Sequence, residues 1–189
     1  MTESPELRNR RWEATHRRIL ATALDLFADL GFEKVSVGQI AARAGVSVPT
    51  FYAHYPSKEH VVMALPSAAE VDALLATQPT DLPVGERIRR AADHLFAHMP
   101  PDEYEELETR WRIIARSPTL RTRAAEFERQ TAGMVAERLP EPGGVPGPAH
   151  VVQAGAYLAA YTAALLAWAD SNGERKLDET LDEAFRALG

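Results

Sequence analysis

The sequence predicts an all-α fold of about nine helices. Apolar residues recur at steps of three and four along nearly the whole chain, and helix-starting and helix-ending residues bound these segments. No stretch alternates as a strand does. The 189 residues, 46% hydrophobic and 25% charged, suit one globular domain or a small module joined to a larger one. Cysteine is absent, which excludes disulfides and thiol catalysis and fits a reducing cytosol.

The first three predicted helices are bounded by local signals. Gly31 ends the first helix after a run of apolar residues with helical spacing. Ser36 begins the second and is placed to form a capping box with Gln39. Ser47 caps the third, and Pro49 stands in its first turn, where the missing N–H costs nothing.

A fourth helix begins near Lys58, and Pro66 interrupts it because proline cannot donate the backbone hydrogen bond of a helix interior. The sequence leaves open whether the helix kinks or breaks there. Beyond Pro66 the pattern predicts helices over about 68–77, 84–98, 102–116, 118–139, 149–171 and 176–188.

The charge is unevenly distributed along the chain. The net charge is −6, but residues 1–58 hold eight basic and six acidic side chains, whereas residues 59–189 hold 13 basic and 21 acidic ones. This division predicts a polyanion-binding domain over 1–58, with a basic N-terminal arm, and an acidic domain with another task over 59–189. A solvated N-terminal tail would also explain the charge.

The second and third predicted helices form a helix-turn-helix with Gly45 in the turn. This motif presents the first turns of its second helix to the DNA major groove. An unrelated helical hairpin also needs a glycine turn, so the motif alone leaves that alternative open.

Residues 17–62 closely resemble the DNA-binding domain of TetR/AcrR-family transcriptional regulators. The resemblance implies a ligand-responsive regulator, a repressor rather than an activator, that binds a palindromic double-stranded DNA operator as a homodimer in the bacterial cytoplasm. It rests on these motifs at fixed spacing: Leu26-Phe27-x3-Gly31-Phe32, Ser36-Val37, Ile40-Ala41-x3-Gly45-Val46-Ser47 and Thr50-Phe51-Tyr52-x-His54-Tyr55-Pro56-Ser57-Lys58-Glu59.

The same resemblance implies the DNA-binding residues. Ser36 and Val37 lie at a helix N-terminus that suits a phosphate, and Lys58 heads the fourth helix toward another. On the third helix the implied contacts are Ser47 at its start, Val48, Pro49 and Thr50 toward the bases, and Tyr52 and His54 toward the backbone.

The implied interface has few groups for paired hydrogen bonds. We therefore expect methyl contacts with thymine and DNA shape to supply specificity, while Phe51 and Tyr55 serve packing. Arg8, Arg10 and Arg11 can supply arm contacts to a minor groove or to phosphates, unless the arm is disordered.

Residues 151–169 carry no charge and are long enough to span a membrane. Their alanines contribute little to insertion, so we expect a helix buried on most sides and no membrane partner. The small-residue stripe of this helix and apolar residues nearby resemble the family's two-helix dimer interface. The predicted interface residues are Gly155, Ala159, Ala163, Ala167, Trp168, Leu181 and Phe185.

Apolar and aromatic residues of the C-terminal domain can line an effector cavity or simply fill the core. The stretch 108–123 and the last two helices faintly resemble the TetR subgroup assigned acyl-CoA-like ligands, which implies a small apolar or acyl-type effector. The candidate lining residues are Phe96, Met99, Tyr104, Trp111, Ile114, Phe127, Met134, Tyr157 and Tyr161.

The sequence predicts no catalytic site, no cofactor and no metal. His94 and His98 have a spacing that can bind metal, but no third ligand is evident. The chain lacks a phosphate loop, a nucleophile elbow and a dinucleotide fingerprint. The alternatives are an apolar-ligand-binding protein with a vestigial helix-turn-helix, an activator of the same family, and an α-helical enzyme.

Overall fold

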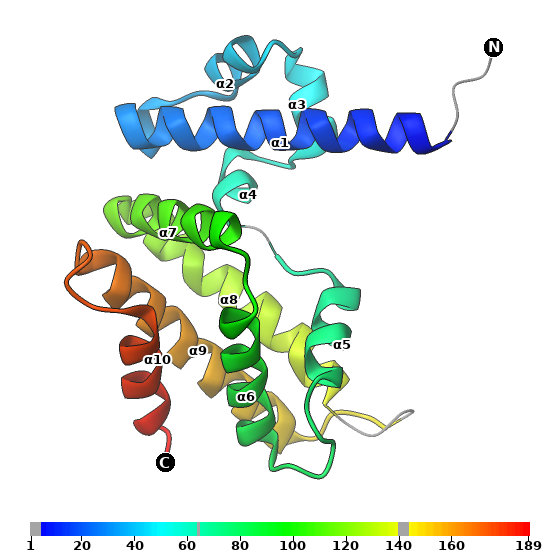
Figure 1. Cartoon of the computed structure of the whole chain (residues 1–189), viewed down its shortest axis with the longest axis vertical. Helices are drawn as coiled ribbons and strands as arrows, with labels where there is room; N and C mark the ends of the chain where they lie inside the picture. The colour runs from blue at the N-terminus through cyan, green and yellow to red at the C-terminus, as the bar shows by residue number, and fades with distance from the viewer. Residues whose placement is uncertain (1–4, 64, 140–143) are drawn as a thin grey trace. The chain divides into compact units, whose positions relative to one another are not determined.

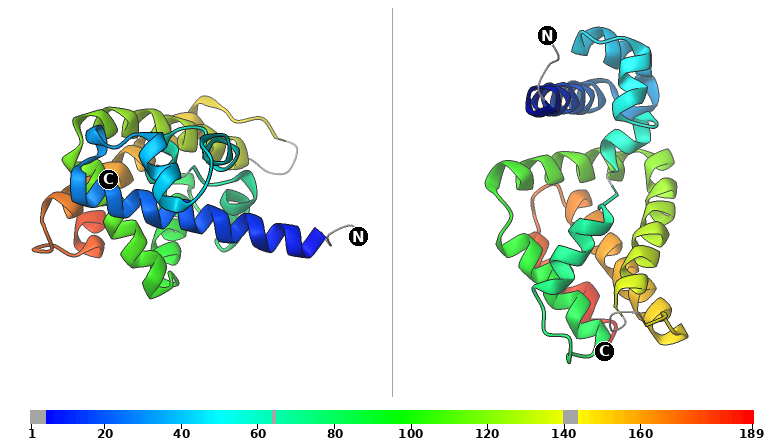
Figure 2. Two further views of the ribbon diagram at one scale, coloured as in Figure 1. Left: turned by 90° about the horizontal axis from the view of Figure 1, so that it is seen from above. Right: turned by 90° about the vertical axis from the view of Figure 1, so that its right-hand side faces the viewer.

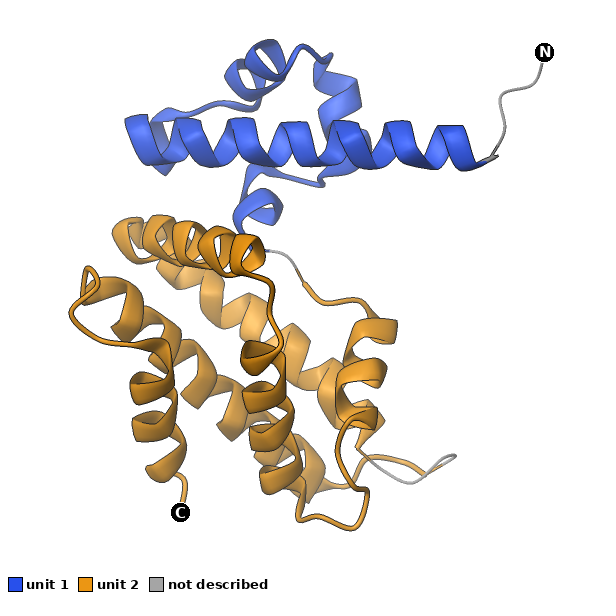
Figure 3. Ribbon diagram, viewed as in Figure 1, with its two compact units in different colours: residues 1–64 blue, residues 65–189 orange. Residues whose placement is uncertain are grey.

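The computed structural model describes residues 5–63, 65–139 and 144–189 (Figure 1). Within these ranges the chain forms ten α-helices and one short 3-10 helix, η1, and no strand, which confirms the all-α prediction. The chain divides into two compact units, residues 1–64 and residues 65–189 (Figure 3). The predicted division of functions at residue 58 stays a prediction.

Unit 1 is a small helical bundle of α1 (Pro5–Leu30), η1 (Phe32–Lys34), α2 (Val37–Ala44), α3 (Val48–His54) and α4 (Lys58–Val62). Its core is made by side chains of all four α-helices that are at most 2% exposed. These side chains are Ile19, Ala23, Phe27, Ile40, Ala41, Phe51, Val61 and Val62. Helix α1 packs against α2 and α4, and α3 packs against α2.

The basic N-terminal residues belong to α1 and do not form a separate arm. Residues 5–18 continue the helix that the sequence predicted only around its apolar run. The physical reason is local: Pro5 can open a helix, Glu6 in the first turn suits the helix dipole, and neither glycine nor proline follows until Gly31. Gly31 then ends the helix with φ 85°.

The predicted helix boundaries around the turn are confirmed. The Ser36 hydroxyl accepts a hydrogen bond from the Gln39 N–H at 3.2 Å, and the Gln39 side chain accepts one from the Ser36 N–H at 2.8 Å. Gly45 ends α2 in the left-handed region with φ 66°, and Ser47 caps α3. Local chemistry thus fixes both ends of the turn.

The predicted fourth helix ends before Pro66 and does not continue through a kink. Helix α4 ends at Val62, and α5 begins at Ala68 after the N-cap Ser67, which forms a second capping box with Glu70. Proline removes one helical hydrogen bond, and the capping box beside it supplies a new helix start.

Unit 2 consists of α5 (Ala68–Ala76), α6 (Val84–Ala97), α7 (Pro101–Arg116), α8 (Pro118–Arg138), α9 (Pro148–Asp170) and α10 (Leu177–Arg186). These bounds lie within two residues of the predicted ones. Helix α9 is central, since it packs against α6, α7, α8 and α10, as Figure 2 shows for α8 and α10. It is also the one helix of the described residues that is long and apolar enough to cross a membrane.

Two apolar clusters fill unit 2 and meet at Tyr157 of α9. One joins α5, α6, α8 and the start of α9, and the other joins α6, α7, α9 and α10. Gly85 of α6 lets the two helices approach closely, because a Cβ at this position would lie 2.5 Å from the Tyr157 ring. Gly133, in the exposed middle of α8, has nothing within 4 Å of the same position.

This contrast gives a matched pair of substitutions. Gly85→Ala should lower the free energy of unfolding by about 1–3 kcal/mol, because the Tyr157 ring must move. Gly133→Ala should raise it by about 0.5–1 kcal/mol, because alanine replaces glycine in an open helix interior. Denaturant unfolding followed by circular dichroism measures both, and equal effects of the two changes would contradict the close approach at Gly85.

Candidate nucleic-acid interface

Helix α3 presents an exposed face directly after the capped turn. Phe51 is completely buried and anchors the helix, whereas Val48 is 41% exposed and Tyr52 53% exposed. Pro49 and Ala53 are also exposed, so this face consists of short apolar side chains and one phenol. A protein surface of this kind fits contacts with thymine methyl groups more than paired hydrogen bonds to bases.

The hydroxyl groups at the start of α3 bind each other. The Ser47 Oγ lies 2.7 Å from the Thr50 Oγ1 and accepts a hydrogen bond from the Thr50 N–H at 3.1 Å. Thr50 is half-buried as a result of its place at the edge of the exposed face. The predicted DNA contacts of Ser47, Pro49 and Thr50 stay predictions, with Thr50 less open than Pro49.

An open hollow of about 470 Å³ lies at one edge of this face. It brings the N-terminus of α2 together with the Tyr52 ring and the start of α4. The first N–H groups of α2 carry the positive end of the helix dipole, which favours an anion. The residues around the hollow are Glu33, Lys34, Val35, Ser36, Val37, Tyr52, Ser57, Lys58 and Glu59.

Lys58 has a structural role that the sequence did not predict. Its Nζ donates hydrogen bonds to the Phe32 carbonyl at 2.9 Å and to the Val35 carbonyl at 3.0 Å, and it lies 4.2 Å from the centre of the Phe32 ring. The ammonium group therefore joins the start of α4 to the turn before α2. A third N–H remains for the predicted phosphate contact.

A stack of rings lies at the other end of α3. The Trp12 ring is 4.8 Å from the His16 ring and 4.8 Å from the His54 ring, and His16 stacks on Tyr55 at 4.3 Å. The Tyr55 hydroxyl donates to the His16 carbonyl at 3.2 Å. Sequence reasoning did not single out Trp12 and His16, although their helical spacing places them in line with the buried Ile19 and Ala23 of α1.

His54 is partly buried in this stack. Burial lowers the pKa of the His54 imidazole, and its Nδ1 is buried without a hydrogen-bond partner in the part of the chain that the structure describes. The neutral imidazole is thus favoured at pH 7, because a charged ring would be poorly solvated.

The three arginines predicted as arm contacts point in different directions. A helix turns by about 100° per residue, so Arg8 and Arg10 project roughly 160° apart, and Arg11 lies between them. All three are exposed. Their predicted DNA contacts stay predictions.

The predicted effector residues lie in the interior of unit 2. Phe96, Tyr104, Trp111, Tyr157 and Tyr161 pack against the cluster of α9 and α10. Phe96 stacks on Tyr161 at 5.8 Å, and burial raises the pKa of the Tyr161 phenol. Of the other candidates, Ile114 is buried and the rest are half-buried, namely Met99, Phe127 and Met134.

The predicted interface residues separate into two groups. Trp168, Leu181 and Phe185 are 4–6% exposed and pack inside the protomer, so we assign them to its own core. Ala159, Ala163 and Ala167 are exposed on α9, and Gly155 is half-buried beside them. The pattern of apolar residues in the sequence is the same for an internal contact and for a contact with a partner.

The described residues hold no group of three or more side chains suited to a metal ion. His94 and His98 stack on each other at 4.0 Å, and His98 Nδ1 lies 2.9 Å from the His94 carbonyl oxygen. These contacts within α6 and its C-cap explain the spacing of the two histidines.

A short helix with exposed apolar and phenolic side chains, placed directly after a capped turn in a small helical unit, has the arrangement of the helix-turn-helix in DNA-binding regulators. The family described as "Bacterial regulatory proteins, tetR family" matches residues 19–65. The family described as "MftR C-terminal domain" matches residues 82–189, more than half of the chain. The chain belongs to the TetR family of transcriptional regulators, which are not enzymes.

Relatives of known name agree with this assignment. The regulator TcmR of Streptomyces glaucescens is 31% identical over 147 residues, which are 71% of this chain and 64% of TcmR. The regulator EthR of Mycobacterium tuberculosis is 49% identical over 47 residues, 25% of this chain and 22% of EthR. The matched parts span less than two thirds of either relative.

Solved structures share the fold. The fatty acid degradation regulator FadR of Bacillus halodurans has a TM-score of 0.54 and 15% identity, with 100% of this chain and 96% of FadR covered. NalD of Pseudomonas aeruginosa, the secondary repressor of a multidrug efflux pump, has a TM-score of 0.51 and 20% identity, with 92% and 95% covered.

The environment of His54 predicts a pH dependence of stability. Because its pKa in the folded chain lies below the ordinary 6.5, the unfolded chain binds more protons near pH 6. The stability contributed by neutral His54 is therefore present above pH 6.5 and is lost as the pH falls toward its folded pKa. Thermal unfolding between pH 7.5 and 5.5 measures the loss.

The change His54→Gln should reduce this pH dependence, while His98→Gln, at an exposed histidine, serves as the control. Proton NMR titration, with the His54 signal assigned through the variant, gives the pKa directly. A His54 pKa at or above 6.5 would contradict the role of burial.

Proposed function

We propose that the protein is a homodimeric repressor that binds a palindromic DNA operator and is released by a small apolar or acyl-type effector. The exposed face of α3, with Val48, Pro49 and Tyr52 turned outward after a capped turn, is the observation that carries the proposal. A sequence without cysteine suits a regulator that works in the reducing cytoplasm.

In this proposal, α3 lies in the major groove and reads bases mainly through apolar contacts. Val48 and Pro49 offer methyl and ring carbons to thymine, and the sequence-dependent shape of the DNA adds to the selection. Tyr52 can donate its phenolic hydrogen to a phosphate beside the groove. The α2 N-terminus with Ser36 and Val37, together with the remaining N–H of Lys58, can bind the same backbone.

The homodimer is proposed to form through the exposed face of α9. Val151 is 56% exposed and Val152 68%, and the small residues Ala159, Ala163 and Ala167 follow on the same helix. A long apolar helix with one side open to solvent suits contact with its own copy across a two-fold axis. Such a dimer can present two α3 helices to half-sites spaced by about 34–36 Å.

The effector is proposed to bind among the aromatic residues of unit 2. Phe96 and Tyr161 stack there, and Tyr104 lies 5.6 Å from Trp168, so the surroundings are apolar with a few phenols. An effector releases DNA if it binds more tightly to a dimer whose α3 helices are not spaced for successive major grooves.

The DNA-binding role is tested with duplexes from the protein's own upstream region. Tyr52→Ala should weaken binding by about tenfold or more, because a hydrogen bond to a charged phosphate is lost. Ala21→Ser, on the outer face of α1, is the control and should leave affinity unchanged. Fluorescence anisotropy measures affinity, and footprinting should show two protected half-sites. Equal affinities of wild type and Tyr52→Ala would remove the assignment of this face.

The dimer is tested by placing a charge on the exposed face of α9. Ala163→Arg should give a monomer with unchanged helix content, since the side chain points to solvent in the protomer but would lie in the interface. Ala125→Arg, at an exposed position of α8, should leave the dimer intact. Sedimentation velocity separates the two states, and a dimeric Ala163→Arg protein would rule out this interface.

A further inference from the structure

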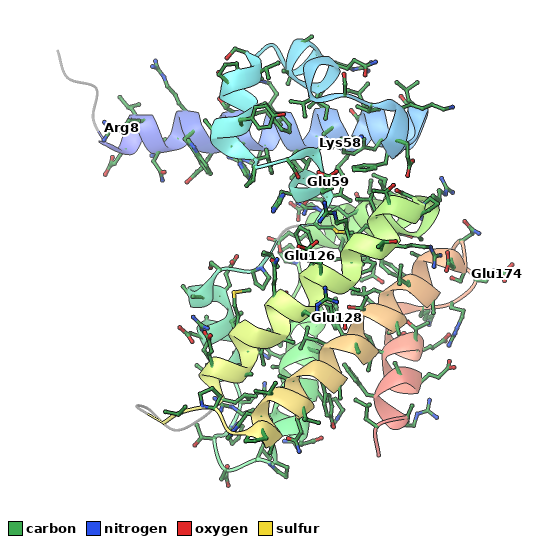
Figure 4. All side chains as sticks on the ribbon, turned by 180° about the vertical axis from the view of Figure 1, so that it is seen from behind. Arg8, Lys58, Glu59, Glu126, Glu128 and Glu174 are labelled. Atoms are coloured by element: carbon green, nitrogen blue, oxygen red, sulfur yellow. The ribbon has the colours of Figure 1, made fainter. Side chains whose placement is uncertain are left out.

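We infer that Asn172 is a modification site, at which the side-chain amide is lost by deamidation and isoaspartate or aspartate is formed. Asn172 precedes Gly173 in the turn that joins α9 to α10. Figure 4 shows the neighbouring Glu174 at the outer tip of this turn. The chemistry belongs to the turn itself and does not depend on the proposed DNA binding.

The reaction is an intramolecular displacement followed by hydrolysis. The backbone nitrogen of Gly173 attacks the side-chain carbonyl carbon of Asn172, so a new C–N bond forms and the bond to the amide nitrogen breaks. The proton of the Gly173 N–H leaves with that nitrogen as ammonia, and a five-membered succinimide ring remains. Water opens the ring at either carbonyl, which gives aspartate or isoaspartate and one new negative charge. Nothing is oxidised or reduced.

The first observation is that the attacking nitrogen is not held by a hydrogen bond. In the part of the chain that the structure describes, no group accepts a hydrogen bond from the Gly173 N–H. The next two N–H groups are both held by Ser171: Glu174 donates to its carbonyl at 3.1 Å and Arg175 to its hydroxyl at 3.2 Å. A backbone N–H within a helix must first lose its bond before it can react. Gly173 has no such bond to lose.

The second observation is the open space around this nitrogen. Gly173 has no side chain, and nothing lies within 4 Å of the position that a Cβ would occupy. Both Asn172 and Gly173 are exposed. The side-chain carbonyl of Asn172 is therefore open to attack, and water has access to the ring that forms.

The third observation is how weakly the asparagine itself is restrained. Asn172 has φ 50° and is the one non-glycine residue with a positive φ among those described, a conformation that costs free energy for an L-residue. Gly173, which follows it, adapts its backbone freely. The amide nitrogen donates one exposed hydrogen bond, to the Asp170 carbonyl at 3.2 Å. Such a bond contributes little net free energy in water.

The two products should differ in their effect on α10. Isoaspartate adds a methylene group to the main chain between residues 172 and 173, so the bonds of Glu174 and Arg175 to Ser171 cannot both keep their geometry. These bonds lead directly into α10, which buries Leu177 and Phe185 in the apolar cluster that it shares with α9. Aspartate leaves the main chain unchanged in length.

The site is tested by incubating the full-length protein at physiological temperature, in buffers from neutral to mildly alkaline pH, followed by digestion and mass spectrometry. The peptide that contains Asn172 should be converted, and faster at higher pH, because the attacking nitrogen must lose its proton. The chain has two asparagines, so Asn9 is an internal control. It lies within α1, is followed by Arg10, and donates a hydrogen bond to Glu13 at 2.9 Å. Asn9 should stay intact.

A synthetic peptide of residues 168–178 gives the rate for an unrestrained chain. Asn172 in the folded protein should react within about tenfold of that rate, because one exposed hydrogen bond restrains its amide. If the folded protein keeps this amide while the peptide is fully converted, the turn protects Asn172 and the inference is overturned. Equal conversion of Asn9 and Asn172 would overturn it as well, since the local geometry would then have no effect.

A second measurement detects isoaspartate directly. Protein isoaspartyl methyltransferase, with labelled S-adenosylmethionine, should label the incubated wild-type protein. It should not label Asn172→Gln, in which the longer side chain would have to close a six-membered ring. Labelling of this variant at the wild-type level would place the reaction elsewhere and overturn the site.

Thermal unfolding separates the longer main chain from the new charge. Protein that contains isoaspartate should unfold a few degrees below Asn172→Asp, which carries the charge with a main chain of normal length. Equal unfolding temperatures would contradict the effect on α10.

Discussion

Helix α3 has only seven residues, and such a helix does not persist alone in water. Its existence depends on the complete burial of Phe51 and on the Ser47 cap, which together fix one side and one end of the helix. The other residues of unit 1 are arranged to supply that support: Ile19, Ala23 and Phe27 of α1 and Ile40 of α2 form the core of the same unit. Val48, Pro49, Tyr52 and Ala53 stay exposed on the opposite face of α3.

The same constraint explains the two edges of the exposed face. At one edge, Lys58 fastens the start of α4 to the carbonyls of Phe32 and Val35, which holds the approach to α2 in place. At the other edge, the rings of Trp12 and His54 join α1 to the last residue of α3. Both edges of the exposed face are therefore fixed by contacts between residues far apart in the sequence.

The sequence predicted what depends on local chemistry. Capping signals at Ser36 and Ser47 act over three residues, so these helix starts could be predicted from neighbouring residues. The hydrogen bond of Lys58 to the Phe32 carbonyl joins residues 26 positions apart, and the contact of the Trp12 ring with the His54 ring joins residues 42 positions apart. No local pattern specifies either contact. Periodicity also could not tell a core residue from an interface residue, because both are apolar and recur at the same spacing.

Helix α9 shows how one apolar helix can have two different faces. Its large side chains, Leu165 and Trp168, point into unit 2 and are at most 5% exposed, whereas the exposed positions Ala159, Ala163 and Ala167 are small. Apolar residues therefore occur on both faces of the helix: Ala154 and Ala164 are buried with Leu165 and Trp168, whereas Val151 and Val152 are exposed. Large residues fill the space that their own protomer encloses. Small residues leave a flat surface, which a second copy of the same helix can approach closely without either protomer having to repack its core.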